Sequence, residues 1–128
     1  MRTIVFWLAL FVAGLLIGFI PQYLKVRDLR RQVNVCNAAF QLGEARRLAS
    51  LTYVSATQLN YGNASGYANQ FFDRVRQIAA STSDASGRTM LTDVLSARDK
   101  IMDDLSKGNP QVVSELQPIV LEIEGAGK

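Results

Sequence analysis

Residues 4–20, IVFWLALFVAGLLIGFI, decide the fold of this chain of 128 residues. These 17 consecutive positions carry no charged or polar side chain. As an α-helix the run spans roughly 25 Å, near the lower limit for crossing the hydrocarbon core of a bilayer. Trp7 and Tyr23 lie near its two ends, where membrane helices place aromatic residues at the water interfaces. The run therefore predicts a single N-terminal transmembrane helix.

A cleaved secretory signal is the main alternative, because it also begins with a basic residue and an apolar run. Such signals end in small residues at the cleavage site. Here the run ends in Gly18-Phe-Ile-Pro-Gln-Tyr23, with bulky side chains where small ones belong. The sequence favours an uncleaved anchor over residues 1–22.

The basic residues gather just after the apolar run, whereas only Arg2 and the amino terminus precede it. Positive charge collects on the cytoplasmic side of membrane helices, so we expect the C-terminal domain to be cytoplasmic. The same residues suit the anionic headgroups of the lipid bilayer, although their only role can equally be to set the topology. We call this group the basic collar: Lys25, Arg27, Arg30 and Arg31.

The charge distribution disfavours a nucleic-acid partner, although the net charge is +3. Residues 21–47 hold six basic and two acidic groups, a balance of +4. Residues 93–128 hold four basic and seven acidic groups, a balance of −3, and this end repels a phosphate backbone.

Small residues interrupt the apolar run at helical spacing. We interpret them as lying largely along one stripe, where small side chains let two membrane helices approach closely. The partner is then either a second copy or another membrane-protein subunit. The alternative is that glycine is simply common in membrane helices. The residues are Ala9, Ala13, Gly14 and Gly18.

Residues 23–60 predict a long membrane-proximal helix, with a bend or pause near Gly43. Its apolar positions are spaced 3, 4, 3 and 4 residues apart, which is a heptad seam typical of a coiled coil. The seam either forms a parallel dimer or is covered by the chain's own last helix, and both remain open. The seam residues are Val26, Leu29, Val33, Cys36 and Phe40.

Residues 61–124 predict the rest of a small helical bundle, and residues 125–128 a flexible tail. Turn-forming residues separate apolar stripes of helical spacing, and no alternating strand pattern occurs. The fold class is therefore all-α: one transmembrane helix followed by a bundle of about four helical segments. The predicted turns are residues 61–66 and 81–87, the predicted third helix runs over 91–107, and the last helix starts at Asn109-Pro110.

Residues 48–78 contain a helix ending near Tyr61-Gly62, then Tyr67-Ala68 and an aromatic residue on the return helix. This stretch resembles one tetratricopeptide hairpin, in which small residues let two helices pack closely and aromatic residues fill the gap. The resemblance implies a groove that binds soluble protein partners. A generic helical hairpin with a wide core face remains the alternative. The candidate protein-binding face is Tyr67, Phe71, Phe72 and Val75.

Residues that carry chemistry are scarce. The chain has no histidine, so Asp99, Asp103 and Asp104 have none to join them and are interpreted as an ion-paired surface. The single cysteine, Cys36, has no histidine to activate it. We therefore predict no catalytic residue, no cofactor and no metal ligand.

These patterns predict a non-enzymatic single-pass membrane protein that acts as an accessory or scaffolding subunit of a larger complex. An energy-transducing or transport assembly fits this class. The alternative is a membrane-tethered adaptor that binds soluble partners in a tetratricopeptide-like helical groove.

Overall fold

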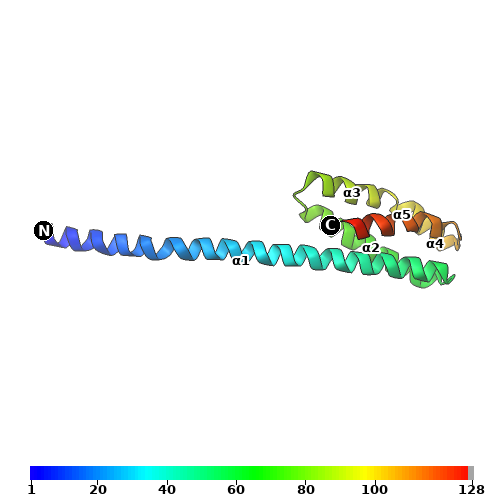
Figure 1. The fold of residues 1–128 in the computed structure, drawn as a ribbon, viewed down its shortest axis with the longest axis horizontal. Coiled ribbons are helices and arrows are strands. Elements are labelled where there is room, and N and C mark those ends of the chain that lie inside the picture. Colours follow the sequence, from blue (N-terminus) through cyan, green and yellow to red (C-terminus); the bar gives the residue numbers. More distant parts are fainter. Residues whose placement is uncertain (127–128) are drawn as a thin grey trace. The chain divides into compact units, whose positions relative to one another are not determined.

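The computed structural model describes residues 1–126, without the side chains of Leu16 and residues 18–24. The described residues form helices and no strand, which confirms the all-α class. The chain divides into two compact units, Met1–Asn37 and Ala38–Lys128. The helices of this described part, labelled in Figure 1, are α1 (Arg2–Thr57), α2 (Tyr61–Ser81), α3 (Ala85–Ser96), α4 (Arg98–Lys107) and α5 (Val112–Gly125).

Helix α1 supplies all of unit 1 after Met1 and continues into unit 2. Gly43 lies inside this helix, so the predicted pause there is wrong. The residues around Gly43 are good helix formers, and a single glycine lowers helix stability by only about 1 kcal/mol. No element boundary separates the predicted anchor, residues 1–22, from the predicted helix over residues 23–60.

The first turn of unit 2 lies earlier than predicted. Helix α1 ends at Thr57 and α2 begins at Tyr61, so the predicted turn over residues 61–66 is helical instead. Leu59 makes the reversal with a left-handed φ of 61°. The side chain of Asn60 then accepts a hydrogen bond from the Asn63 amide at 3.3 Å, which caps α2.

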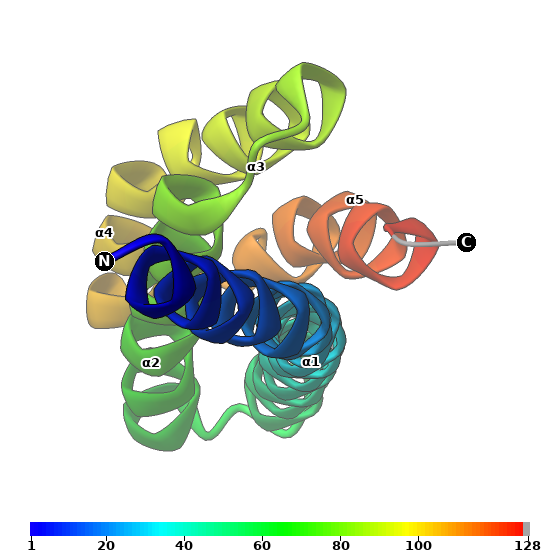
Figure 2. The same ribbon diagram turned by 90° about the vertical axis from the view of Figure 1, so that its left-hand side faces the viewer.

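In unit 2 the end of α1 and α2 run in opposite directions (Figure 1), and Figure 2 shows the short connection between them at the bottom of the view. The contact stripe of α1 is made of small side chains, because Ala45, Ala49 and Ala56 are almost fully buried. Ala64 and Ala68 of α2 are also fully buried. The backbone of α2 approaches α3 and α4 more closely than α1. The close packing of α1 against α2 that the hairpin prediction requires is therefore not found in the described part of the chain.

Helices α3, α4 and α5 complete the core of unit 2. The predicted third helix is interrupted at Ala97, giving α3 and α4. Gly108 ends α4 with a φ of 63°, a conformation that favours glycine. The Asn109 side chain accepts a hydrogen bond from the Gln111 amide at 3.1 Å, just before α5. Pro118 lies inside α5.

The predicted flexible tail, residues 125–128, overlaps the end of α5, because this helix includes Gly125. Residues 127–128 lie outside the described residues.

Within the part of the chain that the structure describes, no helix combines the length and the apolarity needed to cross a membrane. Leu16 and residues 18–20 of the predicted span lie outside the described side chains.

Candidate functional site

The first half of unit 1 exposes apolar side chains on every face of its helix. Ile4, Phe6 and Trp7 are 67–73% exposed, and Phe11 and Ile17 are 70% and 74% exposed. Val5 is 67% exposed as well. Successive positions of an α-helix differ by about 100° in direction, so Ile4, Val5, Phe6 and Trp7 together point to all sides of the helix. A helix that is apolar all round is stable only when lipid or protein surrounds it.

The small residues of this segment do not share one stripe. Ala9 and Gly14 are five positions apart in α1, which separates their directions by about 140°. The prediction of a single packing stripe is therefore wrong, and Ala9 with Ala13 forms a different face from Gly14. All three are exposed, and a Cβ added at Gly14 meets no atom within 4 Å. Gly18 lies outside the described side chains.

The basic collar is open to solvent along α1. Lys25, Arg27, Arg30 and Arg31 are all exposed, and no ion pair involves them among the described residues. Their positions point in directions that together surround the helix rather than one side of it. Four exposed cations within seven residues form a concentrated positive surface next to the apolar segment.

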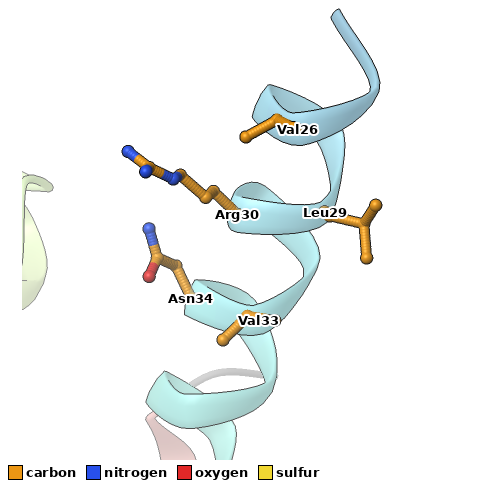
Figure 3. A pocket seen from close by; sticks show the side chains of 5 residues that line it. All are labelled: Val26, Leu29, Arg30, Val33 and Asn34. Atoms are coloured by element: carbon orange, nitrogen blue, oxygen red, sulfur yellow. The ribbon is translucent and has the colours of Figure 1, made fainter. Parts of the chain in front are cut away.

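The predicted heptad seam is exposed. Val26, Leu29 and Val33 are 49–61% exposed, Phe40 is 66% exposed, and Cys36 is a free exposed thiol. A surface depression lies along the seam in unit 1, and Figure 3 shows the side chains that line it. These are Val26, Leu29, Arg30, Val33 and Asn34.

The seven-residue repeat also runs through the apolar segment, a feature that the sequence interpretation missed. Val5, Leu8, Val12 and Leu15 lie seven, or multiples of seven, positions from the seam of the second half of unit 1. All four are 48–67% exposed. A continuously apolar run hides this repeat, because its other positions are apolar too. Valine recurs at one position of the repeat and leucine at the other, and this alternation is the signal from which the repeat could have been predicted.

The candidate binding face on α2 is part of the core. Phe71, Phe72 and Val75 have at most 1% of their surface exposed, and Tyr67 is half-buried against them. The rings of Phe71 and Phe72 meet edge to face with centroids 5.0 Å apart. The prediction of an exposed binding surface there is wrong, because a wide core face accommodates both adjacent aromatic residues.

The acidic residues of α4 lie in an ion-paired surface. Asp103 pairs with Lys107, and Lys100 contacts both Asp104 and Glu115 of α5. The Asn109 amide donates a hydrogen bond to Asp104 at 2.8 Å, and this bond above all lowers the pKa of Asp104. Of these contacts, the Lys100–Glu115 ion pair joins α4 to α5, and the others lie within α4 or between α4 and the following turn. In the described part of the chain, no cluster of three or more His, Cys, Asp or Glu residues is placed to hold a metal ion.

Comparisons with protein-family models, curated proteins and solved structures found no match to the chain. No comparison therefore supports membership of residues 48–78 in the tetratricopeptide family.

Proposed function

We propose that this protein is a non-catalytic, single-pass membrane protein whose cytoplasmic helical bundle scaffolds a larger membrane assembly. The apolar segment of α1, exposed on all sides, is the observation that carries the proposal. Leu, Ile, Phe and Val near the middle of a membrane helix each favour insertion by about 0.3–0.6 kcal/mol. The segment from Ile4 to Ile20 is rich in these residues and has no charged side chain to oppose insertion. Its lowest free energy is therefore expected in the hydrocarbon core of a bilayer.

The basic collar supports this placement. Each Lys or Arg close to an anionic lipid surface contributes about 1 kcal/mol of attraction. The collar begins five residues after Ile20, so its first cations lie near the headgroups when residues 4–20 span the hydrocarbon. Positive charge on this flank also favours a cytoplasmic bundle.

The bundle supports a structural role. Its interior is filled by aliphatic and aromatic side chains from α1 to α5, with Thr52 and Ser55 as the buried polar residues. The hydroxyl of Thr52 donates to the carbonyl of Leu48 at 2.8 Å and is thereby satisfied. The adaptor alternative needs the α2 aromatic face at the surface, and that face is buried. We therefore favour the scaffolding role.

The experiment is crosslinking and mass spectrometry of the protein in its native membrane, followed by solubilisation in mild detergent. We expect other membrane subunits to copurify and to crosslink to lysines of the bundle. Migration of this chain without any other subunit, with or without crosslinker, contradicts the scaffolding role.

A further inference from the structure

We propose that unit 1 pairs with unit 1 of a second copy as a parallel, two-stranded coiled coil. The seam has the two alternating positions of a heptad, called a and d. From Val5 to Cys36, valine occupies four of the five a positions and leucine three of the five d positions. The a positions are Val5, Val12, Phe19, Val26 and Val33, and the d positions are Leu8, Leu15, Gln22, Leu29 and Cys36. The side chains of Phe19 and Gln22, which depart from the pattern, lie outside the described ones, and the next a position, Phe40, belongs to unit 2.

This pattern selects the number of strands in a parallel coiled coil. A β-branched residue at a together with leucine at d favours parallel dimers over trimers and tetramers. Residues with these shapes fill a dimer only when the partner has the same spacing, and a second copy supplies it. The interface is then the same surface on both subunits, as in most homodimers.

The depression in Figure 3 has the lining that such a dimer requires. In a parallel coiled coil, a d-position side chain inserts between two a residues, one d residue and one e residue of the facing helix. Val26, Leu29, Arg30 and Val33 occupy these four positions and line the depression. Its occupant is therefore Leu29 of the second copy.

The exposed area is sufficient for a stable pair. The seven valine and leucine side chains of the seam are 48–67% exposed in the single chain. Covering them on both copies removes about 1,300 Å² from solvent or lipid, which is within the size range of specific interfaces. The part from Val26 to Cys36 gains from the hydrophobic effect where water surrounds it.

The charges beside the seam predict an unusual salt dependence. In a parallel pair, Lys25 of one copy lies next to Arg30 of the other, and both are positive. Salt screens this repulsion, so we expect dimerisation to increase with ionic strength. A partner recognised through acidic groups would bind less tightly under the same change.

Crosslinking through the single thiol, Cys36, tests the pairing of the two copies directly. The proposed dimer does not depend on the membrane anchor of the proposed function. In a parallel dimer the two Cys36 residues face each other, at a separation that a disulfide can bridge. We expect copper(II) phenanthroline to give a covalent dimer of the full chain in native membranes. Two copper(II) ions each accept one electron, the two thiols release their protons to water, and the sulfur–sulfur bond forms. The variant Cys36→Ser should give none.

The control moves the thiol away from the seam. Ala38 is exposed and lies about 200° around the helix from Cys36, so Cys36→Ser with Ala38→Cys should stay monomeric. Equal crosslinking from both positions, or no dimer from Cys36, overturns the proposal. Other subunits can still copurify when this crosslink is absent. A negative result therefore contradicts the dimer without contradicting the scaffolding role.

A second measurement does not use the thiol. The mass of the full chain, produced without its partner subunits and solubilised in detergent, should be twice 14.1 kDa after correction for detergent. Leu29→Asn should weaken dimerisation by about tenfold or more, since each copy loses a buried leucine. Val35→Asn, at an exposed position outside the seam, should leave it unchanged. A trimeric mass, or equal dimerisation of the two variants at unchanged helicity, contradicts the pairing.

Discussion

Gly108 ends α4 in a left-handed conformation, with φ at 63°. Gly108→Ala should lower the free energy of unfolding by about 1–2 kcal/mol, because a Cβ is strained in this conformation. The added Cβ meets a Tyr61 ring carbon at 3.4 Å, so contact with the ring adds little. Denaturant unfolding followed by circular dichroism measures the change.

Gly66 provides a matched control with the opposite sign. It lies inside α2, and a Cβ there meets nothing within 4 Å. Gly66→Ala should therefore raise the free energy of unfolding by about 0.5–1 kcal/mol. A loss of stability at Gly66, or none at Gly108, would show that the backbone conformations differ from those described.

Asp104 links the α4–α5 contact to pH. The hydrogen bond from Asn109 lowers the pKa of Asp104 from its ordinary value of 3.8, and Lys100 and Lys107 act in the same direction. A carboxyl whose pKa is lower in the folded state stabilises the fold above its unfolded pKa. This contribution is lost as the pH falls below 3.8 and through the folded pKa.

The variant Asp104→Asn should therefore have a lower Tm than the wild type at neutral pH, and the difference should shrink in acid. Thermal unfolding at neutral pH and below pH 3.8 measures both values. Asp93→Asn is the control, because Asp93 is exposed and its carboxylate has no ion-pair partner in the described part of the chain. A Tm difference for Asp104→Asn that persists unchanged in acid would exclude the carboxylate as its cause.

At the scale of elements, the close packing of α2 depends on small side chains. Ala68 is fully buried in the core of unit 2. Ala68→Leu should destabilise the protein by about 1–3 kcal/mol, because a well-packed interior has no room for three more carbon atoms. Ala80→Leu, at an exposed position near the end of the same helix, should change stability by less than about 0.5 kcal/mol. Similar unfolding curves for the two variants would contradict the close packing.

The elements also show what the sequence can and cannot reveal. The stripe of α2 is clear from periodicity, because one face of the helix is buried. In α5 the apolar residues Val112, Val113, Ile119 and Val120 are adjacent pairs, so periodicity does not decide which of each pair is buried. The turn at Leu59 is not clear from the sequence either, since leucine rarely adopts a positive φ and the nearby glycines give a stronger turn signal. The break at Ala97 carries no turn residue at all.

The seam of unit 1 and the aromatic face of α2 could be predicted from the sequence only in part. The seam from Val26 to Cys36 stands out because polar residues separate its members. In residues 4–20 every position is apolar, so periodicity cannot distinguish one face from another. The burial of Phe71 and Phe72 depends on helices distant in sequence, and no local pattern could decide which of them was exposed.

At the scale of the whole molecule, all buried core residues among the described side chains belong to unit 2. Its buried residues run from Ala45 to Ile123, and unit 2 begins at Ala38. A chain of residues 38–128 should therefore fold by itself, with a cooperative thermal transition in circular dichroism. A non-cooperative transition of this shortened chain would mean that residues 1–37 are needed to complete the core.

Membrane attachment should depend on the apolar segment. Leu10 lies near the middle of residues 4–20 and is 54% exposed. An arginine in the centre of a membrane helix costs about 2.5–3.5 kcal/mol, more than several leucines contribute. Leu10→Arg should therefore reduce the fraction of protein in the membrane pellet, whereas Leu10→Ile should not.

The most direct test of the anchored bundle is alkaline carbonate extraction of membranes from cells that make the full chain. Carbonate releases peripheral proteins but leaves a spanning helix in the bilayer. The protein should remain in the membrane pellet, and residues 38–128 alone should stay in the supernatant. Release of the full chain into the supernatant would contradict the membrane anchor.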